Sequence, residues 1–152
     1  MTSPSPPDTT SATHQPLAGV RVLDLTRLLP GPAATRHLAD LGAEVIKIED
    51  PGPGDYARDM MRSSADRVAE RPSLFFRALN RGKTEMRLDL KRAEDREALI
   101  ELARHADVLI ESFRPGVMAR LGVGWDTLRA ANPALVMCSI SGYGQEIGRA
   151  HV

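Results

Sequence analysis

The chain has 152 residues, enough for one domain and marginal for two. It is 42% hydrophobic and 26% charged, as in soluble globular proteins, and its formal net charge of zero gives no general attraction to nucleic acid or to an anionic membrane surface. No apolar run is long enough to cross a bilayer. The single cysteine, Cys138, excludes a disulfide framework and fits a reducing, cytoplasmic compartment, and we expect its thiol to be buried in the segment LVMCSI.

The segment before the first apolar run, MTSPSPPDTTSATHQP, is rich in Pro, Ser and Thr. Because this composition cannot bury enough apolar surface to fold, we expect residues 1–16 to form a disordered tail. The segment lacks the basic start and apolar core of a secretion signal, and it has no Arg of the kind that transit peptides carry. The folded part is therefore expected to begin at residue 17.

From residue 20 onward, short apolar segments alternate with helical patterns. Strands are predicted over 20–25, 44–49, 86–90, 107–111 and 134–141. Helices are predicted over about 33–41, 91–106 and 125–132, with a turn and a short helix over 114–122, and with irregular structure over 55–80. This alternation implies right-handed crossovers, and nearly continuous apolar strands fit a sheet covered on both faces. The predicted class is α/β, with an open, doubly wound, Rossmann-like and mostly parallel sheet.

The helix that follows the first strand has clear boundary signals. Pro32 suits its first turn, and Gly42 suits the position just after its end. Helical periodicity places Ala34, Leu38 and Leu41 on one apolar face.

In doubly wound sheets, ligands bind beyond the carboxyl ends of the strands. The segments at those ends are 26–32, 49–55, 89–92, 111–116 and 141–145. The first has free N–H groups at a helix N-terminus, where an anion is favoured, but a dinucleotide fingerprint would need glycines beyond Gly31. In the turn DPGPGD, Pro51 and Pro53 remove two N–H groups that a phosphate loop requires, which favours an ordinary turn.

Basic and aromatic side chains follow two of these strand ends. Lys91 and Arg92 come just after the third predicted strand, where they suit either a phosphate or a solvated basic surface. Phe113 and Arg114 follow the fourth, and an aromatic face beside a guanidinium suits a purine ring. Arg120, two turns further on, is a candidate for a phosphate contact.

The two histidines of the predicted helices are interpreted as structural. His37 and His105 have no carboxylate or cysteine at metal-ligand spacing, so no metal site is expected. His105 falls at a helix C-terminus, where a cation is favoured.

Three stretches follow one another in the chain: LAGVRVLDLTRLLPGPAATRHLADLGAEVIKIEDPGPGD, LFFRALNRGKTEMRLDLK and ADVLIESFRPGVMARLGVGWDTLRAANPALVMCSISGYGQ. Taken in this order, they resemble the family III CoA-transferases (the CaiB–BaiF group), which include the alpha-methylacyl-CoA racemases. The resemblance covers about residues 17–145. It implies a large Rossmann-like domain, of which this chain is the truncated N-terminal part, together with a smaller second domain and a dimer of two interlocked rings.

The resemblance also implies binding of acyl-CoA esters, with coenzyme A as a substrate and no permanently bound cofactor. The implied contacts are Leu28, Leu29 and Pro30 at the nucleotide end, Leu88, Asp89, Leu90 and Lys91 at the adenine, Ser112, Phe113 and Arg114 on the CoA, and Arg120 on a phosphate. Two positions depart from the family pattern. Family members often carry Arg where this chain has Asp50, and an asparagine is expected where it has Ser112. An aspartate near a phosphate is repulsive.

The connection GDYARD…LFFRALNRGK is of the long form found in transferases, whereas racemases of this group have a shorter one. The resemblance therefore favours a CoA-transferase, which moves CoA between an acyl-CoA and a carboxylic acid. In that mechanism an aspartate attacks the thioester, releasing CoA thiolate and forming an acyl anhydride on the enzyme. Racemases use a His/Asp pair to move the proton α to the thioester carbonyl. Both catalytic sets follow SGYGQ in the family, so no catalytic residue is assigned here.

Two alternatives to the transferase remain open. One is a racemase or epimerase of the same superfamily. The other is a stand-alone nucleotide-binding module, which would bind free CoA or NAD without turnover. As part of a transferase, the chain alone is expected to be inactive.

The ending EIGRAHV departs abruptly from the resemblance after Gln145. These residues are also the translation of GAG ATC GGA AGA GCA CAC GTC, which from ATC onward is the start of a widely used sequencing-library adapter. We therefore interpret residues 146–152 as a non-native, adapter-derived tail and the chain as the front half of a longer enzyme. A truncated paralogue is the alternative.

Overall fold

The computed structural model of the protein describes residues 15–146. The predicted tails therefore lie almost wholly outside the described residues. Of the segment 1–16, only Gln15 and Pro16 are described, and they lead into a turn in which Ala18 N donates to Gln15 O (3.0 Å). Of the segment 146–152, only Glu146 is described.

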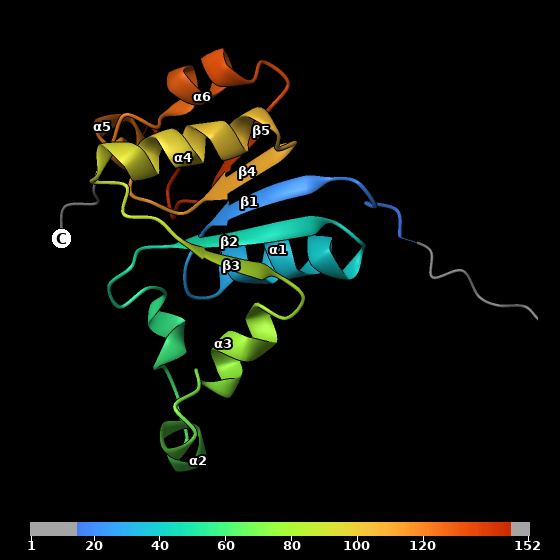
Figure 1. Ribbon diagram of the computed structural model, residues 1–152, viewed down its shortest axis with the longest axis vertical. Helices are drawn as coiled ribbons and strands as arrows, with labels where there is room; N and C mark the ends of the chain where they lie inside the picture. The colour runs from blue at the N-terminus through green and yellow to red at the C-terminus, as the bar shows by residue number, and fades with distance from the viewer. Residues whose placement is uncertain (1–14, 147–152) are drawn as a thin grey trace, which may run out of the picture.

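Five parallel strands form one sheet in the order β3–β2–β1–β4–β5 (Figure 1). They are β1 (Arg21–Leu25), β2 (Glu44–Glu49), β3 (Thr84–Arg87), β4 (Val108–Glu111) and β5 (Val136–Ser139). Leu23 of β1 pairs with Ile46 on one side and with Leu109 on the other. The chain thus builds outward from β1 to β3 and then crosses to β4, which confirms the predicted doubly wound topology.

Helices cover both faces of the sheet. On one face lies α1 (Pro30–Asp40), with α3 (Leu74–Leu79) beside it. On the other lie α4 (Ala93–Arg104), α5 (Val117–Arg120) and α6 (Trp125–Ala131). None of the described helices is long and apolar enough to cross a membrane.

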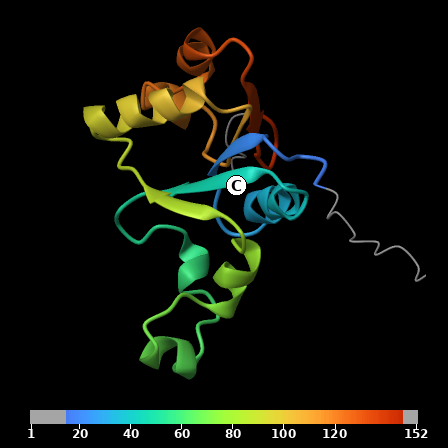
Figure 2. The same ribbon diagram turned by 45° about the vertical axis from the view of Figure 1, so that its right-hand side comes forward.

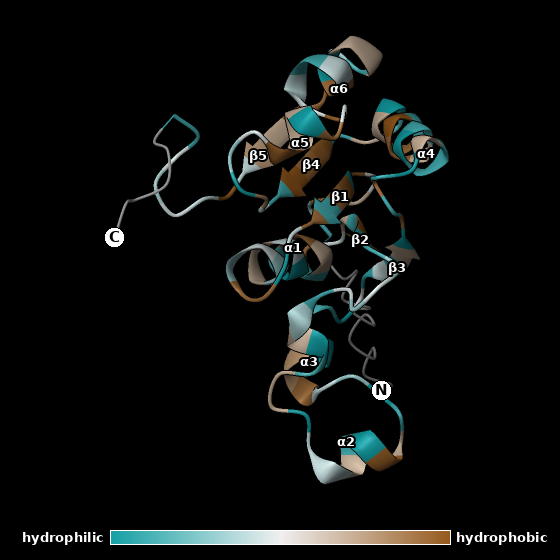
Figure 3. Cartoon of the chain, turned by 90° about the vertical axis from the view of Figure 1, so that its left-hand side faces the viewer, coloured by the Kyte–Doolittle hydropathy of each residue, from teal (hydrophilic) through white to brown (hydrophobic). Residues whose placement is uncertain are grey.

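The two faces of the sheet have different interiors, because alternate residues of a strand point to opposite sides. The larger apolar core lies beneath α4 and α6 and includes Leu23, Leu99 and Leu128, all fully buried. Figure 3 shows that β4 is largely hydrophobic, whereas α4 carries hydrophilic and hydrophobic residues on different sides. The core beneath α1 is smaller, because the residues of β1 and β2 that point toward α1 include the buried charges Asp24 and Lys47.

Segment 55–80 is more regular than predicted, and it projects from the sheet with α2 farthest away (Figure 2). It contains a 3₁₀ turn, η1 (Tyr56–Arg58), as well as α2 (Ser64–Val68) and α3. Each begins at a side-chain cap, formed by Asp55, Ser63 and Ser73 respectively. The prediction of irregular structure here was therefore wrong, because these helices are too short to show an apolar period and depend on their caps.

The third strand also differs from its prediction over 86–90. It lies over Thr84–Arg87, where Thr84 pairs with Ile46. Leu88 and Leu90 follow the strand and are buried in the core beneath α4, so their apolar character reflects packing and not strand pairing.

Two predicted burial patterns were wrong in whole or in part. Of the predicted apolar face of α1, Leu38 packs on the smaller core, whereas Ala34 and Leu41 are exposed. Thr35 is buried in α1 instead, because its hydroxyl turns inward to donate to Asp24 Oδ2 (2.6 Å). Cys138 is exposed, because β5 pairs only with β4 in the described part of the chain and is an edge strand there.

Candidate functional site

A cavity of about 520 Å³ opens at the carboxyl ends of β1 to β4. Apolar side chains that line it are Leu25, Ile48, Leu88, Leu90, Phe113 and Leu121. Polar side chains that line it are Arg27, Glu49, Asp50, Tyr56, Asp89 and Lys91. Doubly wound sheets bind ligands at this edge, at the topological switch point. In this sheet the switch point lies at β1, because the chain continues to β2 on one side of β1 and later to β4 on the other.

The loops after β1 and β4 are tied together at this point. Arg27 N donates to Ser112 Oγ (3.1 Å), so the hydroxyl bridges the two loops. The buried carboxylate of Glu111 accepts from Phe113 N (2.7 Å), which fixes the backbone that carries the aromatic ring. The ring is therefore held against the edge of the larger core.

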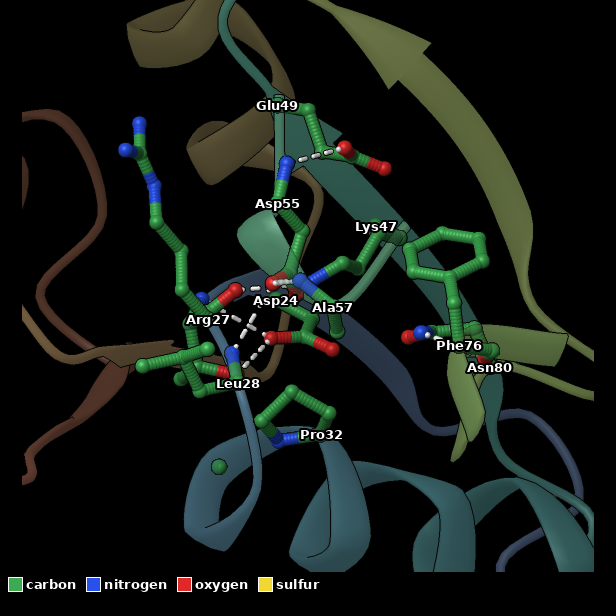
Figure 4. Close-up of polar contacts among 12 residues, drawn as sticks. Asp24, Arg27, Leu28, Pro32, Lys47, Glu49, Asp55, Ala57, Phe76 and Asn80 are labelled. Atoms are coloured by element: carbon green, nitrogen blue, oxygen red, sulfur yellow. Dashed lines mark hydrogen bonds and ion pairs between the residues drawn. The ribbon is translucent and has the colours of Figure 1, made fainter. Parts of the chain in front are cut away.

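The loop from β1 to α1 has an unusual backbone. Leu28 adopts φ +66°, a left-handed conformation that a non-glycine residue avoids unless it is held there. Its N–H donates to Asp55 Oδ1 (3.0 Å), a contact visible in Figure 4. As a result the apolar side chains of Leu28 and Leu29 point outward, with 38% and 52% of their surfaces exposed.

Asp55 and Lys47 form a fully buried ion pair beneath this loop (Figure 4). Lys47 Nζ lies 3.0 Å from Asp55 Oδ2 and also donates to Thr26 O (2.5 Å). Asp55 Oδ1 accepts from Ala57 N (2.9 Å) as well as from Leu28 N. One carboxylate and one ammonium therefore connect β2, η1 and the loop that follows β1.

A second buried pair lies on the other side of the same loop. Lys83 Nζ is 2.9 Å from Asp24 Oδ2 and also donates to Thr35 Oγ1 (2.7 Å). Asp24 Oδ1 accepts from Thr26 N (3.0 Å). Burial favours the neutral form of Asp24, but Lys47 and Lys83 outweigh it, so the pKa of Asp24 is lowered. Burial also lowers the pKa of Lys83, and the charge of Asp24 opposes this.

Glu49 anchors the projecting segment at the end of β2. Its carboxylate accepts from Arg58 Nε (2.9 Å) and Nη2 (2.7 Å), and from Asp55 N (2.7 Å). The guanidinium of Arg58 also lies over the ring of Phe76, 4.0 Å from its centroid. Burial alone would raise the pKa of Glu49. The hydrogen bonds from Arg58 and from Asp55 N outweigh the effect of burial, so the pKa of Glu49 is lowered. Glu49 in turn raises the pKa of Arg58.

The structure brings some predicted site residues together and separates others. Those in the wall of the 520 Å³ cavity are Leu88, Asp89, Leu90, Lys91 and Phe113. Leu28, Leu29 and Pro30 are exposed at the start of α1, and Ser112 is engaged by the loop after β1.

The two predicted arginines lie outside this cavity. Arg114 lines a neighbouring cavity of about 310 Å³, together with Glu111 and Trp125. Arg120 is exposed on α5, and its Nη1 lies 3.1 Å from where a Cβ of Gly116 would be. Adjacent residues of one loop thus face two different cavities.

The predicted turn DPGPGD uses its backbone donors internally. Gly52 N donates to Asp50 Oδ1 (3.1 Å), and Asp55 N donates to Glu49. This agrees with an ordinary turn at this position. Across residues 15–146, no group of three or more His, Cys, Asp and Glu side chains is placed to hold a metal ion.

The model of CoA-transferase family III matches residues 17–151 of the chain. The chain belongs to CoA-transferase family III. A relative from Acetobacter aceti, named acetyl-CoA:oxalate CoA-transferase, is 47% identical over 136 residues, which cover 90% of this chain and 34% of the relative. Another from Haloarcula hispanica, named succinyl-CoA:mesaconate CoA-transferase, is 45% identical over 128 residues, which cover 84% and 32%.

Solved structures confirm the family III fold. A CAIB/BAIF family protein from Brucella suis superposes with a TM-score of 0.80 at 38% identity, covering 89% of this chain and 35% of the other. Rv3272 from Mycobacterium tuberculosis gives a TM-score of 0.78 at 43% identity, covering 88% and 36%. The chain therefore spans about a third of the length of each of these relatives.

Sequence reasoning missed the buried charges that support the pocket of this family III chain. Asp24 and Lys47 stand at inward positions of the otherwise apolar strands VRVLDL and EVIKIE. A charge at such a position is almost never fully buried unless it has a partner, and this signal was available in the sequence. Asp55 and Lys83, which lie in loops, carry no comparable local signal.

Proposed function

We propose that this family III chain forms the CoA-binding part of a CoA-transferase that moves CoA between an acyl-CoA and a carboxylic acid. The observation that carries the proposal is the convergence of Leu88, Leu90, Lys91 and Phe113 on one cavity at the carboxyl edge of the sheet. Its volume of about 520 Å³ is in the range of small-molecule sites. Its apolar wall and the ring of Phe113 suit a purine, and Lys91 supplies a cation for phosphate.

The exposed leucines next to the cavity extend this surface. Leu28 and Leu29 are held outward by the Asp55 contact to the backbone, so they offer apolar area to a ligand that leaves the pocket over α1. Arg114 and Arg120 are proposed to contact the CoA from the loop after β4 and from α5. Ser112 contributes by holding the loops together, and Pro30 by starting α1.

The proposed chemistry is acyl transfer through a carboxylate nucleophile. Its oxygen bonds to the thioester carbon, the C–S bond breaks, and CoA leaves as thiolate, giving a mixed anhydride. The thiolate then attacks the enzyme's own carbonyl carbon in that anhydride, the donor acid leaves as carboxylate, and the acceptor acid takes CoA from the resulting enzyme thioester by the same two steps in reverse. The aspartates beside the pocket are not assigned this role. Asp24 and Asp55 are buried in ion pairs, and Asp50 is paired with Arg27. The two relatives described above are named as CoA-transferases, which favours transfer over racemisation.

The proposed setting is a cytoplasmic homodimer of interlocked subunits, with acyl-CoA and a carboxylic acid as partners and with no nucleic acid, membrane or permanently bound cofactor. Support for the dimer comes from the family resemblance and from the projecting segment. There Met61, Val68 and Leu74 are exposed apolar side chains. Support for the reducing compartment comes from the single, unpaired Cys138.

Calorimetric titration of the purified protein with CoA and with NAD tests the proposal. We expect binding of CoA and none of NAD. Phe113→Ala should weaken CoA binding by about five- to hundredfold, the range for loss of base–aromatic stacking. Tyr143→Ala, a change of an exposed aromatic residue that lines neither cavity, is the matched control. Binding of NAD without CoA would favour the stand-alone nucleotide-binding module instead.

A further inference from the structure

An ion pair lies across the polar side of the pocket. Arg27 Nη2 is 2.5 Å from Asp50 Oδ2, and the two side chains are 31% and 33% exposed. The guanidinium carbon of Arg27 also lies 5.8 Å from the centroid of the Tyr56 ring. All three residues line the cavity, so any ligand there meets this pair directly.

Asp50 is held in place from two sides. Its other carboxylate oxygen, Oδ1, accepts from Gly52 N (3.1 Å) in a turn of the Asx type. Arg87 Nη1 donates to the carbonyl oxygens of Pro51 and Gly52 (both 3.2 Å), which fixes the same turn. The carboxylate is therefore a fixed feature of the pocket wall.

The remaining charges show which cation is free for a ligand. Glu49 is paired with Arg58, and Asp89 Oδ1 accepts from Lys91 N (3.1 Å). The Lys91 ammonium forms no ion pair with any described residue, whereas the guanidinium of Arg27 already has an anion. The pocket thus holds one available cation and one that is neutralised by Asp50.

We infer that Asp50 is a specificity-determining residue of this pocket, which weakens the binding of ligands that carry phosphate near Arg27. A phosphate that approaches Arg27 must either displace the Asp50 carboxylate or lie beside it, and both cost affinity. Removing the negative charge while keeping the shape leaves Arg27 free to bind the phosphate. The inference rests on the proposed function for the identity of the ligand as CoA.

The test compares the wild-type protein with Asp50→Asn by calorimetric titration with CoA, dephospho-CoA and pantetheine. We expect Asp50→Asn to bind CoA about three- to tenfold more tightly, with a gain that shrinks as salt rises from about 50 to about 500 mM. Pantetheine, which carries no phosphate, should bind both proteins equally. A gain with CoA alone assigns the effect to the 3′-phosphate, and an equal gain with dephospho-CoA assigns it to the diphosphate.

Asp40→Asn is the matched control, because it removes the same charge from another ion-paired aspartate that does not line the cavity. A second variant, Arg27→Gln combined with Asp50→Asn, should lose the gain, since the freed guanidinium is its source. Unchanged or weaker CoA binding by Asp50→Asn, relative to Asp40→Asn, would overturn the inference. Absence of CoA binding by every protein would contradict the proposed function itself.

Discussion

Lys47 Nζ lies 3.0 Å from Asp55 Oδ2, and neither side chain is exposed to solvent. The pair lies on the α1 face of the sheet, where Asp24 and Lys83 form a second buried pair. Each charge also makes hydrogen bonds to neighbouring groups, so all four are satisfied. If one charge of a buried pair is removed, its partner stays buried without an opposite charge. The free energy of desolvating that remaining ion is then no longer offset, and the folded state is destabilised.

Lys47→Met is expected to lower the free energy of unfolding by about 3–5 kcal/mol, because it leaves the Asp55 carboxylate buried and without its cation. Arg104→Met is the control, since Arg104 forms an exposed pair with Glu101 (3.2 Å) and its removal should cost about 0–1 kcal/mol. Urea denaturation of both variants measures the difference. Equal losses of unfolding free energy in the two variants would show that burial does not determine how much the Lys47–Asp55 pair contributes to stability.

Gly31→Ala is expected to destabilise the protein by about 1–3 kcal/mol through overpacking. An added Cβ would lie 2.2 Å from Thr26 Cβ, and the Thr26 hydroxyl cannot move away because it donates to Asp24 Oδ1 (2.5 Å). Gly142→Ala should be nearly neutral, since nothing lies within 4 Å of its added Cβ. Thermal unfolding checks the pair of variants, and a stable Gly31→Ala protein would contradict the packing described for this loop.

Stability is expected to fall as the pH drops below about 4.5, the ordinary pKa of Glu49. The pKa of Glu49 is lowered in the folded protein, so its contribution is present above its unfolded value and is lost as the pH falls through the folded value. Asp24 acts in the same direction from an ordinary value of 3.8. Glu49→Gln should therefore flatten, but not abolish, the acid slope of unfolding free energy measured between about pH 3 and 7. An unchanged slope would exclude Glu49 as its source.

Arg58→Lys is expected to loosen the projecting segment over 55–80. Lysine keeps the charge but loses the two-nitrogen contact to Glu49 and the stacking on Phe76. A loss of about 1.4 kcal/mol in local opening would speed protease cleavage within the segment about tenfold. Arg67→Lys, on α2 of the same segment, is the control, because the Arg67 side chain has no ion pair or hydrogen bond to another described residue. Equal cleavage rates for the two variants would argue against Arg58 as the anchor.

The architecture of the sheet was predictable from the sequence, whereas the buried ion pairs beside the pocket were not. Segments such as VRVLDL and DVLIE carry their strand signal locally, and the alternation with helices fixes a parallel order. The pairing of Lys47 with Asp55 depends instead on how the segment after β2 folds back, which no local pattern encodes.

The same distinction applies to the candidate site. Lys91 and Phe113 could be placed near one another because parallel strands end at one edge of the sheet. The sequence could not show that the neighbouring Arg114 faces a different cavity. The directions of successive side chains in a loop depend on tertiary contacts, such as the hydrogen bond from Phe113 N to the Glu111 carboxylate. The Arg27–Asp50 pair likewise joins two loops that are distant in the chain.

The two buried ion pairs beneath the loop after β1 also constrain how this chain can evolve. Because removal of any one of the four charges leaves a buried ion without its partner, substitutions at Asp24, Lys47, Asp55 and Lys83 are tolerated only in compensating combinations. Single changes at these positions pass through unstable intermediates, so the four residues are expected to be inherited as one unit. The apolar positions of the opposite core can drift one at a time, since swaps of similar volume there cost little.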